Sequence, residues 1–127
     1  MTAGTLSRSE QIAQLNDRAR QAMGLACVAV ATDGFRALPV EDQSRVRELV
    51  ETFDAFTPDN DPYGERDFGA IYQDGEGRWT TMRPARPVEK VFWKIDAYDR
   101  ELRFGSLDPA NPAVTQRVLT IMLANEY

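Results

Sequence analysis

The chain has 127 residues, of which 43% are hydrophobic and 28% charged, and its formal net charge is −5. This size and composition are typical of a globular protein, so we expect a single domain over residues 1–127 with a flexible start at residues 1–6. The chain contains no histidine and one cysteine, Cys27. These counts exclude Ser-His-Asp and Cys-His catalysis, and also zinc sites built on histidine or paired cysteines.

Hydropathy and cysteine content predict where such a protein works. No apolar run reaches the roughly 18 residues that span a bilayer, and the first residues lack the pattern of a signal peptide. A lone thiol cannot form an internal disulfide, which fits a reducing compartment. We therefore expect a cytoplasmic bacterial protein with no membrane partner.

A helix and a strand are expected first. Apolar residues at helical spacing run from a Ser7 or Ser9 N-cap to Met23, and Gly24 suits the left-handed end of this helix. The apolar run 25–31 has the length of a buried strand and is expected to be central in its sheet.

A turn at residues 32–34 and Pro39 then lead into a second helix. Four apolar residues form the inner face of this helix: Val46, Leu49, Val50 and Phe53.

Strands dominate the second half of the chain. Aromatic and β-branched residues predict strands at 67–73, 78–82 and 88–95, and a fourth at 101–104 that pairs across a turn at 96–100. Strands grouped in this way favour an antiparallel sheet over a doubly wound one.

The last element is predicted to be a helix, because Asn111 suits an N-cap and Pro112 suits the first helical position. Its apolar face would carry four residues: Val114, Val118, Ile121 and Met122. The order α-β-α-β-β-β-α predicts an α+β fold, with an antiparallel sheet of about four to five strands packed with three helices.

Negative charge is concentrated between residues 40 and 76, which hold 11 acidic and 3 basic residues. A loop there provides five candidate partner-binding residues: Asp59, Asp61, Tyr63, Glu65 and Asp67. Three interpretations stay open: Asp59 and Asn60 cap turns around two prolines, the carboxylates hold a cation, or the loop binds a partner. The spacing lacks the bidentate carboxylate of a calcium loop, so we predict no metal site and no cofactor.

A second candidate segment covers residues 92–100. It provides six candidate partner-binding residues: Trp93, Lys94, Asp96, Tyr98, Asp99 and Arg100. An exposed tryptophan near basic and tyrosine side chains is typical of binding hot spots. The alternative is that Trp93 lies in the core and the two later aspartates form turns.

Three stretches, within residues 56–69, 92–106 and 108–124, resemble a family of small bacterial proteins known only as a domain of unknown function. Members of that family occur on plasmids and other mobile elements, some near anti-restriction genes. The resemblance covers residues 7–127 and implies no activity. The stretch 79–87 departs from the family by being longer and richer in arginine and proline.

Two functions from different classes follow. The resemblance and the acidic segment together predict a non-enzymatic interaction protein that blunts a host defence system by binding one of its proteins. Its partner would carry a basic surface that otherwise holds nucleic acid, while the chain itself would not bind nucleic acid directly. The alternative is a metal-dependent hydrolase that uses the aspartates of the acidic loop or Asp96 and Asp99.

Overall fold

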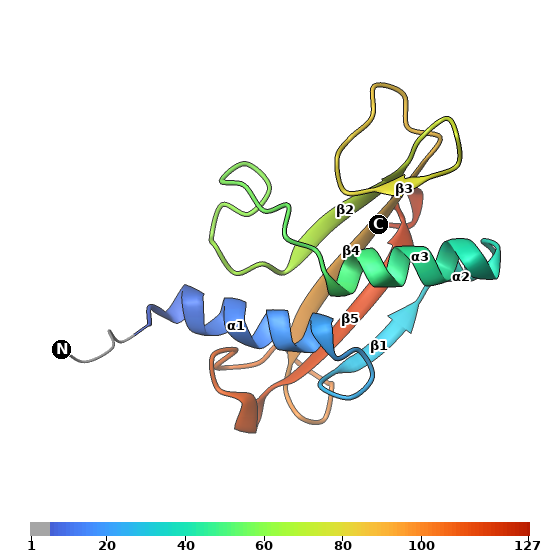
Figure 1. Cartoon of the computed structure of the whole chain (residues 1–127). Helices are drawn as coiled ribbons and strands as arrows, with labels where there is room; N and C mark the ends of the chain where they lie inside the picture. Colours follow the sequence, from blue (N-terminus) through green and yellow to red (C-terminus); the bar gives the residue numbers. More distant parts are fainter. Residues whose placement is uncertain (1–5) are drawn as a thin grey trace.

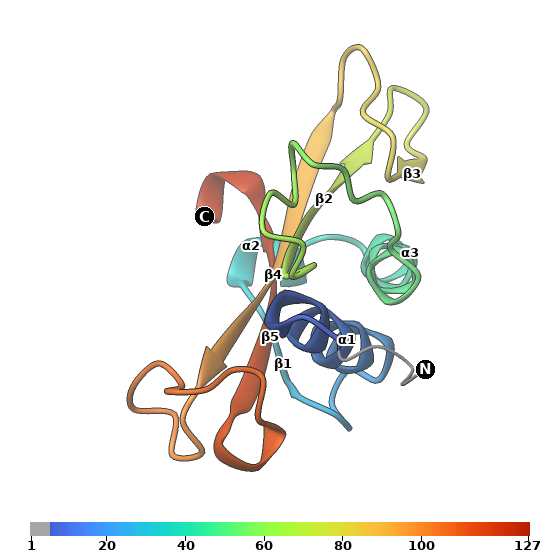
Figure 2. The ribbon, with the colours of Figure 1, turned by 90° about the vertical axis from the view of Figure 1, so that its left-hand side faces the viewer.

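The computed structural model describes residues 6–127, which form a five-stranded sheet with helices packed against it (Figure 1). The flexible start predicted at residues 1–6 lies, except for Leu6, outside the described residues. Two long helices, α1 (Arg8–Gln21) and α3 (Val40–Glu51), cover one face of the sheet, and the short helix α2 (Asp33–Arg36) lies on the other side (Figure 2). The predicted α+β fold is confirmed.

The sheet has the strand order β1-β5-β4-β2-β3 and is antiparallel except for the parallel pair of β1 with β5. Its strands are β1 (Val28–Ala31), β2 (Phe68–Gln73), β3 (Trp79–Thr80), β4 (Glu89–Tyr98) and β5 (Gln116–Leu123). The strands predicted at 67–73 and 88–95 are confirmed as β2 and β4.

Both long helices begin where the sequence predicts. The Ser7 hydroxyl accepts a hydrogen bond from the Glu10 amide at 3.1 Å and caps α1, and Gly24 follows the helix at φ +81°. Helix α3 begins directly after Pro39 and buries Val46 and Val50.

The predicted C-terminal helix is wrong. Asn111 and Pro112 start only a single 3₁₀ turn, η1 (Pro112–Val114), after which β5 enters the sheet between β1 and β4. Its backbone pairs with β4 over eight residues, and alternate side chains such as Leu119 and Ile121 are buried against the helices. A central strand position satisfies both sides of the backbone, so tertiary pairing outweighs the local helix-start signal.

Three smaller expectations also need correction. The strand expected at 25–31 is shorter, and it lies at the edge of the sheet rather than in its centre; Leu25 before it is 92% exposed. The turn at 32–34 is the start of α2, which Thr32 caps. Residues 101–104 form no strand, and only one isolated bridge, Tyr98 with Gly105, is formed there.

The core lies between the sheet and the two long helices. Trp93 of β4 is fully buried, and its ring packs edge-on against Phe53 and Phe56. Gly69 on β2 is required here, because a Cβ at this position would lie 2.4 Å from the Trp93 Nε1 atom. Among residues 6–127, no helix has the length and hydropathy needed to cross a membrane.

Candidate functional site

The acidic loop, residues 57–67, connects α3 to β2 and stands in front of the sheet beside α1 in Figure 2. Its first turn is held by Asn60, whose Oδ1 accepts from the Thr57 amide at 2.8 Å and whose Nδ2 donates to the Ala55 carbonyl at 2.9 Å. The turn-forming interpretation is therefore confirmed for Asn60. The loop has a defined shape that presents the neighbouring carboxylates in fixed positions.

Four carboxylates of this loop have no cationic side chain within 4 Å among residues 6–127: Asp59, Asp61, Glu65 and Asp67. Asp59 is exposed, whereas the other three are half-buried. The acidic loop therefore carries negative charge that the described part of the chain leaves without a directly paired cation.

Burial and mutual repulsion affect two of these groups. Burial raises the pKa of Glu65, and the nearby charges of Asp67 and Asp61 raise it further, while Arg8 and Arg117 oppose the shift. Burial likewise raises the pKa of Asp67, with additional repulsion from Asp61 and Asp96. A cation that approached the loop would relieve this repulsion.

Arg66 is the single basic residue of the acidic loop, and its side chain is bound by a carboxylate outside the loop. Its Nε and Nη2 atoms donate to the Asp17 carboxylate on α1 at 2.9 and 2.6 Å. The residue adopts φ +52°, a conformation that is rare outside glycine. The bidentate ion pair with Asp17 holds its side chain in this position. The loop's one cation is therefore paired outside the loop, and it acts on Asp61 only through the longer-range charge interaction that helps raise the pKa of Arg66.

Tyr63 is the exposed aromatic residue of the loop, with 80% of its surface accessible. It borders an open hollow of about 390 Å³ that Phe56, Pro58 and Pro62 also line. An exposed aromatic ring beside carboxylates suits recognition of a partner, because aromatic side chains supply contact area at low entropic cost.

Most of the second candidate segment lies in β4, where successive side chains point to opposite faces of the sheet, so its residues do not form one surface. Trp93 faces the helices and is fully buried, so the expectation that it is an exposed contact residue is wrong. Gly69 pairs with Trp93 across the strands, and because it has no side chain it leaves space for the indole ring on the buried face.

Lys94 and Asp96 lie on the face of the sheet opposite α1 and α3, and they form an ion pair of 2.7 Å. Tyr98 is half-buried at the end of the same strand. Asp99 acts as a turn former, since its Oδ1 accepts from the amides of Glu101 and Arg103 at 3.1 and 3.0 Å.

Asp67 is the point where the two candidate segments meet. Its carbonyl accepts a hydrogen bond from the Ile95 amide at 2.8 Å, and its carboxylate is repelled by that of Asp96. Arg100 lies elsewhere, and donates to the Thr115 carbonyl at 3.3 Å. Within residues 6–127, no three acidic or cysteine side chains come together in a metal-binding geometry.

Sequence reasoning missed the polar residues of α1 that position the loop. Asn16 donates to the Glu65 carbonyl at 2.9 Å, and Asp17 binds both Arg66 and Arg20. Arg20 is buried and caps the end of α3 by donating to the Val50 carbonyl at 3.0 Å. The signal was present in the sequence, because Asn16 and Arg20 fall on the apolar face of the first helix.

The fold and the acidic loop define an α+β protein with an unneutralised acidic surface segment. The chain belongs to the family described as "Protein of unknown function (DUF3768)", whose model matches residues 31–126 and so includes both candidate segments. No curated protein and no solved structure matches the sequence.

Proposed function

We propose that this protein is a small acidic interaction protein that binds a partner protein with a basic surface through the acidic loop. The observation that carries the proposal is that four carboxylates of the loop have no ion-pair partner among residues 6–127, while the loop's only base, Arg66, is bound to Asp17. Groups that repel one another in the free protein gain most when a cationic surface arrives.

The proposal extends to the biological setting. We place the protein in the bacterial cytoplasm, among proteins of plasmids and other mobile elements, and its partner among host defence proteins. The support is the resemblance of three sequence stretches to proteins of such elements. The acidic loop would occupy a basic surface that otherwise holds nucleic acid, and the protein would not itself bind nucleic acid.

Charge alone gives such a complex little affinity, because each exposed ion pair contributes roughly 0–1 kcal/mol. Tyr63, which is 80% exposed at the centre of the loop, is the apolar anchor around which the charges act. The four carboxylates then set the association rate and the salt dependence. The metal-dependent hydrolase is not favoured by any observation on the loop.

A defined cationic probe tests the role of the loop. We expect a hexa-arginine peptide, titrated into labelled protein and followed by NMR, to shift the amides of residues 57–67. Replacing Asp59, Asp61 and Glu65 by Asn, Asn and Gln should weaken binding about tenfold, since three pairs of modest strength are lost. Raising salt from about 50 to 300 mM should weaken the wild-type complex in the same direction.

The matched control changes the same charge elsewhere. Glu41, Glu48 and Glu51 are exposed on α3, and replacing all three by Gln should leave the affinity for the peptide almost unchanged. The native partner, captured from the host lysate, should be retained by this control and lost by the loop variant. Salt-insensitive binding that survives the loop substitutions would refute the proposal and direct attention to the sheet face around Lys94 and Tyr98, opposite α1 and α3.

A further inference from the structure

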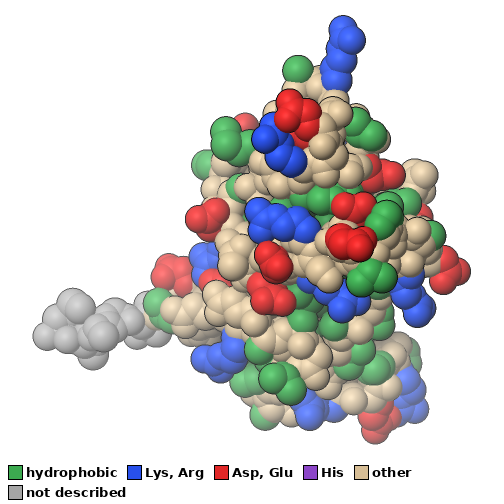
Figure 3. Space-filling view, turned by 45° about the vertical axis from the view of Figure 1, so that its right-hand side comes forward, with side chains coloured by type: hydrophobic (Ala, Val, Ile, Leu, Met, Phe, Trp, Pro, Cys, Tyr) green, Lys and Arg blue, Asp and Glu red, His purple; other side chains and the backbone are tan. Residues whose placement is uncertain are grey.

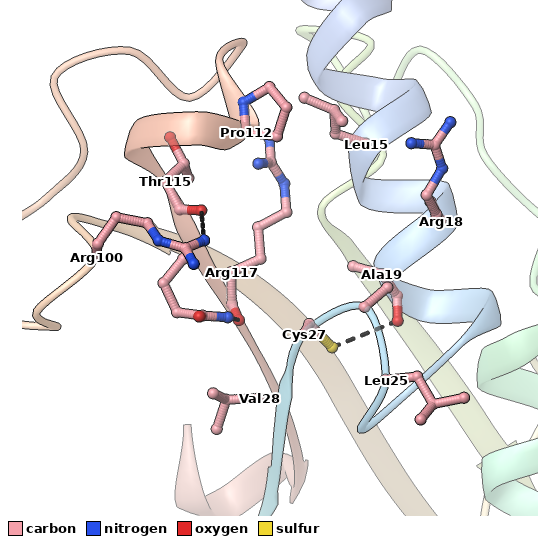
Figure 4. A pocket seen from close by; sticks show the side chains of 12 residues that line it. Leu15, Arg18, Ala19, Leu25, Cys27, Val28, Arg100, Pro112, Thr115 and Arg117 are labelled. Atoms are coloured by element: carbon pink, nitrogen blue, oxygen red, sulfur yellow. Dashed lines mark hydrogen bonds between the residues drawn. The ribbon is translucent and has the colours of Figure 1, made fainter.

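A second hollow, of about 370 Å³, lies on a different part of the molecule (Figure 4). It is bounded by the C-terminal half of α1, by the segment that leads into β1, and by the start of β5. Three of its twelve lining residues are arginines, Arg18, Arg100 and Arg117, and none is acidic. In a chain with a net charge of −5, such a grouping of cations without acids marks a site for an anion.

Arg117 is the central observation. Its side chain is 5% exposed, yet it forms no ion pair within 4 Å with any of residues 6–127. The nearby charge of Glu65 favours the protonated guanidinium, but burial outweighs it and lowers the pKa of Arg117. Two of its nitrogens donate to neutral oxygens: Nε to Asn16 Oδ1 at 2.7 Å and Nη2 to the Pro109 carbonyl at 2.5 Å. Burying a guanidinium is costly unless a negative charge compensates it.

The third nitrogen of Arg117, Nη1, is free to bind a ligand. It makes no hydrogen bond to residues 6–127, and it is absent from the fully buried atoms that lack a partner, so it keeps access to open space. Arg117 lines the hollow, so a ligand there can approach its side chain.

The other two arginines that line the hollow are Arg100 and Arg18, which come from different elements. Arg100 is tied to the Thr115 carbonyl by one nitrogen and has further donors available. Figure 4 shows Arg117 of β5 on one side with Arg100, which lies in the turn after β4, and Arg18 opposite them on α1. Leu25 and Val28, which are 92% and 38% exposed, add an apolar rim.

We propose that this hollow binds a small molecule with a phosphate monoester group, held by Arg100 and Arg117 and approached by Arg18. Guanidinium groups match the oxygens of phosphate in pairs, and three positive charges without an acid suit a dianion better than a single carboxylate. The volume is near the lower end for small-molecule sites, which leaves room for one phosphate and a ring-sized organic group against Leu25 and Val28.

The test uses phenyl phosphate, inorganic phosphate and phenol as probes on the intact chain, followed by NMR. Phenyl phosphate should shift the amides of Cys27, Val28 and residues 115–117. It should bind several-fold more tightly than inorganic phosphate, because only phenyl phosphate also contacts the apolar rim. Phenol should cause no shift there.

Variants assign the interaction to the arginines. Arg100→Gln should weaken phenyl phosphate binding about tenfold, as expected for a lost hydrogen bond between two charged groups. Arg18→Gln should weaken it a few-fold, because this side chain is exposed. Arg117→Gln is less informative, because it also breaks the contacts with Asn16 and Pro109.

Arg103→Gln is the matched control, since Arg103 is exposed near Arg100 in the chain, pairs with Glu101 and does not line the hollow. It should bind phenyl phosphate like the wild type. Equal weakening by Arg103→Gln and Arg100→Gln, shifts confined to another surface, or no binding at millimolar phenyl phosphate would each overturn the proposal. The hollow adjoins the acidic loop through Asn16, which accepts from Arg117 and donates to the Glu65 carbonyl. The two tests stay distinguishable, because Arg100→Gln and Arg18→Gln change no residue of the acidic loop.

Discussion

Asp17 is the residue on which two arginines converge. Arg20 donates to it at 2.8 Å from inside the core, and Arg66 donates at 2.6 Å from the acidic loop. Burial raises the pKa of Asp17, but the hydrogen bonds and charges of Arg66 and Arg20 outweigh this effect and lower it. Helix α1, the end of α3 and the loop are thus joined through one carboxylate.

Replacing Asp17 by Asn should destabilise the protein by about 2–3 kcal/mol, because Arg20 stays buried without a negative partner. Urea unfolding at neutral pH measures this loss, and Asp54→Asn, at an exposed position that forms no ion pair in residues 6–127, is the control. Because the pKa of Asp17 is lowered on folding, its stabilisation is present above the ordinary aspartate value and lost in acid. A loss no larger than that of Asp54→Asn would show that Arg20 does not depend on Asp17.

At the scale of elements, β5 determines the architecture. It pairs with β4 along its whole length and with β1 on its other side, so it is the strand that joins the two parts of the sheet. Burial alternates along β5 with period two up to Ile121, and Met122 is also buried, from the other face. The predicted helix needed Val118, Ile121 and Met122 on one face, whereas the strand turns Ile121 to the face opposite the other two.

Two substitutions distinguish these arrangements. Leu119 is fully buried, so Leu119→Asp should abolish cooperative unfolding by placing an unpaired carboxylate in the core. Val118→Thr, on the face opposite α1 and α3, should cost less than about 1 kcal/mol, because Val118 is only half-buried and threonine is also β-branched. Thermal melts followed by circular dichroism measure both, and the reverse ranking would contradict the position of β5.

Across the whole molecule, carboxylates act on stability in opposite directions. Asp17 favours the folded state when ionised, whereas Glu65 and Asp67 oppose it, because their pKa values are raised on folding. A raised carboxylate pKa means that the folded state binds the proton more tightly. The contribution to stability therefore falls as pH rises from the ordinary value, about 3.9 for aspartate, through the raised one.

Asp67→Asn should accordingly raise the melting temperature at pH 7, with a gain of up to about 1 kcal/mol because the site is partly solvated. The gain should disappear in acid, where the wild-type carboxyl is also neutral. Melting curves from about pH 3 to 7 follow this change, and Asp33→Asn, exposed in α2, should leave the curve unaltered. A destabilised variant at neutral pH would mean that Asp67 has a cationic partner in solution.

The surface shows why net charge is a weak guide to a site. On the face shown in Figure 3, acidic, basic and apolar side chains are interspersed, without a single block of one sign. The acidic loop is distinguished by carboxylates that form no ion pair with the described part of the chain, rather than by its charge count. The arginine-lined hollow is likewise distinguished by Arg117, which is buried and forms no ion pair with the same residues.

The sequence by itself determined the α+β class, the two long helices, strands β2 and β4, and the turn at Asn60. Each of these depends on nearby residues: a Ser7 cap, a helical stripe, a strand pattern, or an amide that bonds its own loop. Tertiary structure decided the rest, since β5 exists because two neighbouring strands pair with its backbone, and Trp93 is buried because Gly69 leaves space for its ring. The same holds for Arg66, whose direction depends on Asp17, 49 residues away in the chain, a contact that no local pattern encodes.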